Sequence, residues 1–305
     1  MRVIVPVTPS LNSSSVPEPD ATFSEVAYSA ATTYALGAQV ISTSSHRIYE
    51  SLQASNTGHA LPVPPLTEND WWLEVGVTNR YAAVDSARST QAVGNSPMTY
   101  TITPGQRINA IALMGMEADS CRIQMFNGAV SVYDKSFDLK LRKVKNGYEY
   151  FFKPFSTQPS VIQFDLPPFS ASTIDVTLTR ISGQVKLGSI VVGNYVYLGS
   201  SQFNATNDAL NFSVVERDIY GTATLVPRRT LPKTNQTLIV EKQFVNDLID
   251  ARSQLNAVPA VWSGLDDNGS SDYFESFLIR GIYKQFSINV SQPYHAAVSL
   301  ELEEI

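Results

Sequence analysis

Four aromatic residues in one short stretch of this chain have the types and spacing for a chemical role. They are Tyr34, Tyr49, Trp71 and Trp72. Aromatic rings offer flat apolar faces with a polar edge, which suits the apolar face and hydroxyl rim of a sugar. The stretch therefore predicts sugar contact through these residues. The alternative is that so small a unit uses its aromatic residues as its own core.

No pattern typical of catalysis or of a metal site accompanies these aromatic residues. His46, His59 and His295 lie in different segments without zinc-ligand spacing, so we expect them to face solvent. Nucleophile-elbow, P-loop and dinucleotide motifs are absent from the sequence. We expect no metal, no cofactor and no enzymatic activity. A glycosidase pair of carboxylates that meets only in the folded chain would leave no such motif.

Two further features have a chemical and a structural interpretation. The stretch from Ser263 to Asp272 is rich in the oxygen ligands that calcium prefers, but it lacks the helix–loop–helix spacing of a calcium loop. Turn formation explains its Asp, Asn and Gly residues. Cys121 is the one cysteine, and its apolar neighbours predict a buried thiol rather than a nucleophile.

Composition limits the class of partner. The net charge of -6 argues against nucleic acid as the main partner, because phosphate binding needs a concentrated positive field. A basic cluster lies beside several aromatic residues and is interpreted as a solvated hairpin face; it contains Lys140, Arg142, Lys143 and Lys145. The first residues do not form a signal peptide and no stretch predicts a membrane span, so we expect assembly in a cytoplasm.

The elements that must position these residues are mainly β. Many glycines, prolines and β-branched residues with only 16% charged residues are typical of an all-β chain with many turns. We expect an N-terminal arm and linker over 1–23, a small aromatic-rich β module over 24–77, an antiparallel jelly-roll-like β-sandwich over 78–200, and a C-terminal β-rich assembly domain over 201–305.

Individual patterns place elements within these regions. Val3, Val5 and Val7 predict an edge strand or docking arm, and Ile174, Val176 and Leu178 predict a strand with one wet face. Asn146-Gly147 predicts a hairpin turn. Helical spacing predicts one helix near 242–256, and alternation at Val298, Leu300 and Leu302 predicts a final paired strand.

The stretch 34–76 also resembles the small chitin-binding-type carbohydrate modules. The residues that carry this resemblance are Tyr34, Gly37, Val40, Tyr49, Asn56, Gly58, Pro62, Trp71, Trp72, Val75 and Gly76. The succession of IALMG, TIDVTLT, GSIVVG and LG resembles galactose-binding-like jelly rolls. The last region, with ERDIYGT, RRTLPK, VWSG and VSLELEEI, resembles the C-terminal part of tail-tip and baseplate proteins of tailed bacteriophages, of the distal-tail type.

These resemblances imply a structural protein of the virion tail. It would assemble with itself into a ring, for which a hexamer is expected, and would join tube, hub or fibre proteins to the apparatus that recognises the host. Its outward modules would contact host surface glycans. Two alternatives stay open: a glycan-degrading or glycan-binding tail adhesin, and spacer modules that dock tail fibres without binding sugar.

Overall fold

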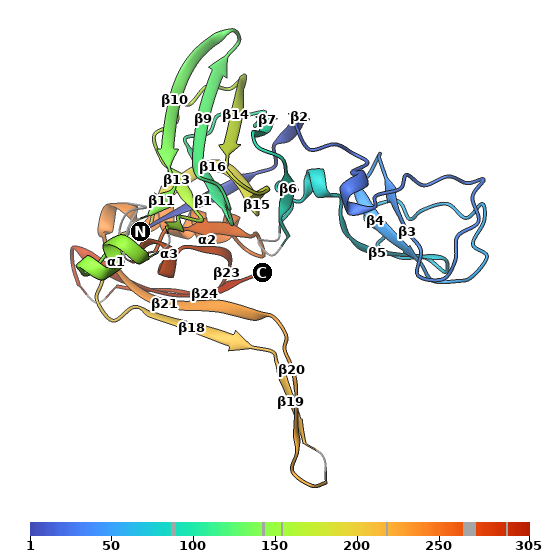
Figure 1. Cartoon of the computed structure of the whole chain (residues 1–305). Helices are drawn as coiled ribbons and strands as arrows, with labels where there is room; N and C mark the ends of the chain where they lie inside the picture. The colour runs from blue at the N-terminus through green and yellow to red at the C-terminus, as the bar shows by residue number, and fades with distance from the viewer. Residues whose placement is uncertain (87–89, 142–143, 154, 218, 265–272, 291) are drawn as a thin grey trace.

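The computed structural model describes residues 1–305 except 87–89, 142–143, 154, 218, 265–272 and 291. Strands account for 49% of the structure and helices for 10%, which confirms the mainly β fold. Figure 1 shows a body of packed sheets from which two parts project: a small unit that contains β3, β4 and β5, and a hairpin that contains β19 and β20.

The body is built on one large antiparallel sheet that takes strands from both ends of the chain. Its strands in spatial order are β13 (Val161–Gln163), β8 (Ala110–Met114), β16 (Ser189–Tyr197), β1 (Arg2–Val7), β22 (Ala260–Trp262), β23 (Ile279–Asn289), β24 (His295–Glu304), β21 (Thr230–Glu241) and β17 (Ser200–Ser201), with β18 (Thr206–Asn211) also paired to β21. β24 pairs with both β21 and β23. The predicted final paired strand is therefore confirmed.

β1 lies inside this sheet, so the expected edge strand or docking arm at Val3, Val5 and Val7 is wrong. The strand pairs with β16 along its whole length, and Val3 and Ile4 also pair with β22. Both of these side chains are fully buried. Pro6, which has no N–H to donate, lies beyond the two residues paired with β22, where the sheet accommodates it.

A smaller antiparallel sheet packs against one part of the large sheet. Its strands in order are β10 (Val130–Asp138), β9 (Ser120–Asn127), β14 (Ser172–Thr179), β7 (Met98–Thr103) and β2 (Ser10–Ser14). Ile174, Val176 and Leu178 of β14 are buried as predicted, in one apolar cluster with Ile111 and Leu113 of β8. The two sheets therefore form a β-sandwich. A short pair, β6 (Ala92–Gly94) with β15 (Val185–Leu187), lies at its border.

The small projecting unit is a three-strand antiparallel sheet held by aromatic residues. Its strands are β3 (Gln39–Ser42), β4 (Arg47–Ser51) and β5 (Trp72–Val77). Short 3-10 turns, η1 (Ala21–Phe23) and η2 (Asn79–Tyr81), lie where the chain enters and leaves it. We call residues 24–77 the module.

The predicted helix near 242–256 is confirmed as α2 (Val245–Gln254), which follows the 3-10 turn η3 (Lys242–Phe244). Leu248, Ala251 and Leu255 from this segment are buried against the large sheet, which fixes the helix by one apolar face. A shorter helix, α3 (Phe274–Phe277), was not predicted.

The hairpin turn predicted at Asn146-Gly147 is wrong, because these residues begin a helix. Asn146 is the N-cap of α1 (Gly147–Phe152), and its side chain accepts a hydrogen bond from the N–H of Glu149. Asn is favoured at a helix N-cap as well as in a turn, so the Asn-Gly dipeptide is compatible with either structure. The flanking strands β11 (Lys140–Leu141) and β12 (Ser156–Thr157) still pair with each other.

β18 and β21 continue outward into a hairpin formed by β19 (Val214–Arg217) and β20 (Ala223–Val226). β21 leaves β24 at the pair between Lys233 and Glu303, and beyond that point the described strands pair only with each other. No described residue from 209 to 232 is buried. We call residues 209–232 the arm.

Candidate functional site

Three of the four aromatic residues expected to contact sugar form the core of the module. Tyr49 and Trp72 are fully buried and Tyr34 is nearly so. The rings of Tyr34 and Trp72 meet edge to face at 5.3 Å, and the Trp72 indole N–H donates to the carbonyl oxygen of His59 at 2.9 Å. Their contribution to any sugar site is therefore through the packing that holds the module together.

Trp71 is the member of the set that reaches the surface. It is half-buried, and its ring stacks on the His59 imidazole at 3.5 Å with an interplanar angle of 8°. Adjacent residues on an extended chain point to opposite sides, which explains why Trp72 is buried and Trp71 is not. The side chain of Asn69 fixes this turn by accepting from the N–H groups of Trp71 and Trp72.

The surroundings of this stacked pair are polar and exposed. Gln53 donates its side-chain N–H to the carbonyl oxygen of Asp70 at 2.7 Å, and Asn69 donates to the carbonyl of Ala60 at 3.1 Å. A flat aromatic pair beside side-chain amides and backbone carbonyl groups is the kind of surface that sugars contact. We call Trp71 and His59 the aromatic platform.

A buried polar network fixes the module to the body. Asn79 donates its side-chain N–H to Asp20 at 2.7 Å and to the carbonyl of Val93 at 2.8 Å, and its side-chain oxygen accepts from the N–H of Val93. The carboxylate of Glu25 accepts from the N–H groups of Asn79 and Asp20, both at 2.7 Å. Because buried carboxylates need hydrogen-bond donors, this network specifies one junction geometry.

A second contact at the junction involves His46, which the sequence predicted to face solvent. It is half-buried and stacks on Tyr81 at 3.7 Å, while its Nδ1 lies 2.9 Å from the carboxylate of Glu18. Burial, followed by the nearby charge of Glu18, raises the pKa of Tyr81. His59 is likewise held in a ring stack, whereas His295 is exposed as predicted.

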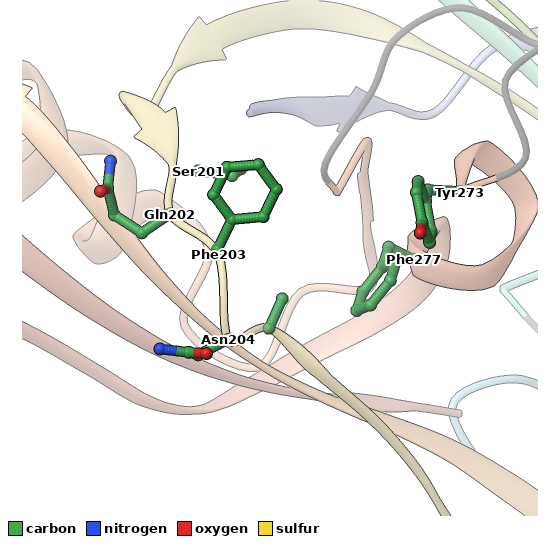
Figure 2. A pocket seen from close by; sticks show the side chains of 7 residues that line it. Ser201, Gln202, Phe203, Asn204, Tyr273 and Phe277 are labelled. Carbon is green, nitrogen blue, oxygen red and sulfur yellow. The ribbon is translucent and has the colours of Figure 1, made fainter.

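An apolar pocket that the sequence did not indicate lies between residues 201–205, which precede β18, and the segment that contains α3 (Figure 2). Its volume is about 360 Å³, and its lining consists of Ser201, Gln202, Phe203, Asn204, Ala205, Tyr273 and Phe277. In Figure 2, Phe203 lies on one side and Tyr273 and Phe277 lie on the other, while the amides of Gln202 and Asn204 point away from the space between them.

Local backbone geometry builds this pocket. Gly264 has a φ of +67°, and a Cβ there would lie 2.5 Å from the Cβ of Phe277, so glycine permits the close approach of α3. Asn204 has a φ of 80°, a region that asparagine tolerates better than most residues. A lone phenylalanine among small polar residues at 200–206 is the sequence signal that could have indicated an exposed anchor.

The remaining candidates are the metal, membrane, cysteine and charged-residue predictions. Among the described residues there is no group of three or more metal-ligating side chains, and no helix of the length and apolar content that a bilayer span requires. Cys121 is buried as predicted, and burial raises the pKa of its thiol to about 12. Most of the acidic stretch, 265–272, lies outside the described residues, as do Arg142 and Lys143 of the basic cluster.

No protein-family model matches the chain, and no curated protein matches it either. Among solved structures, the chain is similar to one described as CpGH89CBM32-6 produced by Clostridium perfringens, with 13% sequence identity and a TM-score of 0.24. The match covers 37% of this chain and 82% of that one. A likeness at this level carries no functional argument, so the case for function rests on the geometry of the chain.

Proposed function

We propose that this protein is a structural subunit of a bacteriophage tail tip or baseplate, of the distal-tail type, and that it acts by assembly rather than catalysis. Copies join into a closed ring, with a hexamer expected, that links the tail tube and hub to the fibres and to host recognition. The protein is made in the host cytoplasm and resides in the virion tail. The observation that carries the proposal is the exposed arm.

The arm supports assembly because its own chain gives it no core. Large apolar side chains along it are exposed, including Phe212 at 52%, Val215 at 53% and Leu225 at 70%. A two-stranded hairpin is marginally stable by itself in water, and exposed apolar strands invite pairing with another chain. Repeated copies around a symmetry axis would supply that partner.

The module supports a role in contact with host glycans. Its aromatic platform is half-exposed and lies on a unit that projects from the body (Figure 1). A single contact of this size would bind weakly, but a ring multiplies the contacts and raises avidity. The galactose-binding-like character of 78–200 remains part of this proposal, while spacer modules that dock fibres are the alternative.

The test of assembly is the mass of the purified protein in solution, measured by light scattering over a range of concentrations. A discrete closed oligomer is expected for the whole chain. A variant in which a two-residue Asn-Gly turn replaces 212–228 should be smaller than the ring, because it lacks the arm. A strict monomer at every concentration would count against the proposal.

The test of glycan contact compares Trp71→Ala with the unaltered protein on immobilised host surface polysaccharide. Loss of binding in the variant is expected, and unchanged binding would remove the aromatic platform from the proposal. Release of reducing ends from the same polysaccharide would instead favour a glycan-degrading enzyme.

A further inference from the structure

Exposed apolar side chains concentrate at two places, one before β18 and one at the tip of the arm. Among the described residues, the three most exposed large apolar side chains are Phe203 at 98%, Ile219 at 91% and Tyr220 at 86%. Phe203 forms one wall of the apolar pocket, and Ile219 and Tyr220 form the tip of the arm. Exposing apolar surface to water is unfavourable, so both places suit an apolar contact.

The pocket suits an apolar side chain better than a charged or strongly polar ligand. Its walls are the rings of Phe203, Tyr273 and Phe277, and the nearby amides point away from the space (Figure 2). The backbone around Phe203 is held in place, since Gln202 donates its N–H to the carbonyl of Thr237 at 2.8 Å and Asn207 donates its side-chain N–H to the carbonyl of Ser276. The pocket is thus a preformed receptor.

The arm of one chain cannot fill its own pocket. The run from Thr206 to Arg217 is mostly strand, and at about 3.3 Å per residue it puts roughly 40 Å of extended chain between the pocket and the tip. Figure 1 shows β19 and β20 pointing away from the body. The pocket is lined by residues 201–205, 273 and 277, and β18 and β19 lie between this lining and the tip, so tip and pocket can meet only between two copies.

We propose that Ile219 and Tyr220 at the arm tip of one copy insert between Phe203 and Tyr273 of the next copy. This contact rests on the proposed ring and names the surfaces that close it. Each copy offers one tip and one pocket, and the two surfaces differ, so the association is head to tail. Repetition of such a contact produces a ring when the rotation closes.

Variants with one added cysteine test the contact directly. Ala205→Cys places a thiol in the pocket lining and Ile219→Cys places one at the tip, while native Cys121 is buried and its thiol pKa is raised to about 12, so it stays unreactive. A short bismaleimide should link the two variants when they are mixed, and neither when it is alone. Ile181→Cys is the matched control, because Ile181 is 84% exposed and belongs to neither surface. Mixed with Ala205→Cys, it should give no link.

A second pair of variants measures the effect on assembly. Ile219→Asp should weaken association at least tenfold in light scattering, whereas Ile181→Asp should leave it unchanged. Both side chains are exposed, so circular dichroism should show both variants folded.

The results separate the two proposals. A closed oligomer without the link between positions 205 and 219, or one that Ile219→Asp leaves intact, would overturn the tip contact and leave the ring standing. A protein that stays monomeric at every concentration would overturn both.

Discussion

The module and the arm both project from the same body, but they differ in stabilisation. The module has a buried core of its own, and the arm has none among its described residues. The module buries Tyr49 and Trp72 completely and joins the body through hydrogen-bonded buried carboxylates. The arm buries none of its described residues and carries its apolar side chains in the open. A projection with its own core can act alone, whereas one without a core depends on a partner.

This difference also separates two uses of aromatic residues. In the module, Tyr34, Tyr49 and Trp72 stabilise the unit from its core, while Trp71 with its stacked partner His59 reaches the surface. In the pocket before β18, Phe203 is almost fully exposed and contributes little to the stability of its own chain. Residue type is therefore a poor guide to which aromatic side chain makes an external contact.

The largest expected effect comes from removing the core of the module. Trp72→Ala should cost about 3–5 kcal/mol, because it deletes a fully buried indole from a very small cluster. The module should lose hydrogen-exchange protection in β3, β4 and β5 while the body keeps its own. Trp71→Ala is the matched control and should retain that protection. Equal loss in both variants would contradict the division of roles within the pair.

A smaller effect is expected at the junction of the module with the body. Asn79→Ala removes three side-chain hydrogen bonds, to Asp20 and to both backbone groups of Val93. Each buried partner left unsatisfied costs about 1–3 kcal/mol. Small-angle scattering should then report a wider range of module positions, although the module stays folded. An unchanged scattering curve with lowered stability would mean that other contacts, such as His46 with Tyr81, fix the orientation.

A substitution of an exposed arm residue should weaken association between copies and leave the free energy of unfolding nearly unchanged. Leu225→Ser should change the free energy of unfolding of the dilute protein by no more than about 0.5 kcal/mol, since the side chain is 70% exposed. Its association measured by light scattering should weaken. Leu36→Ser, at a module residue that is 67% exposed, should change neither quantity. If Leu36→Ser weakened association as much, the module would also be an assembly surface.

The smallest expected effect is on the pH dependence of stability, through an ion pair in the body that carries both projections. The hydrogen bond from Lys186, together with Arg180, lowers the pKa of Glu117. The folded state therefore binds fewer protons at this site than the unfolded chain, so the contribution is present at neutral pH and is lost as pH falls below about 4.3.

Thermal unfolding between pH 3 and pH 7 tests this sign. Glu117→Gln should be slightly less stable than the unaltered protein at pH 7, by less than about 1 kcal/mol because the pair is largely exposed, and the two should converge near pH 3. A difference that grows toward pH 3 would contradict the assignment.

Periodicity was a sound guide where one face of an element is buried. The alternation at Ile174, Val176 and Leu178 and the helical spacing over α2 both appear in the structure as predicted. Such patterns indicate which face of a single strand or helix is buried. They do not record which strands become neighbours, so β1 was predicted at an edge although it lies inside the sheet.

The sequence predicts the candidate site less completely than it predicts the strands and helices. The aromatic stretch was found, but core and surface aromatic residues look alike, and only the fold separates Trp72 from Trp71. The pocket draws on two segments, near 203 and near 275, that meet through tertiary packing. Asn146 was misread because a single local motif can cap a helix or turn a hairpin.

The position of β1 has a consequence for the order of events during synthesis. Arg2–Val7 is synthesised long before its partners in the large sheet, which are Val192–Tyr197 and then Val261 and Trp262. At roughly 5–20 residues per second, β22 follows on the order of 10 to 50 s later. β1 can pair with β16 once Val192–Tyr197 has been made, but its other edge stays unpaired until β22 follows. The large sheet therefore closes late and slowly, and chaperone contact with β1 would favour the correct sheet over aggregation.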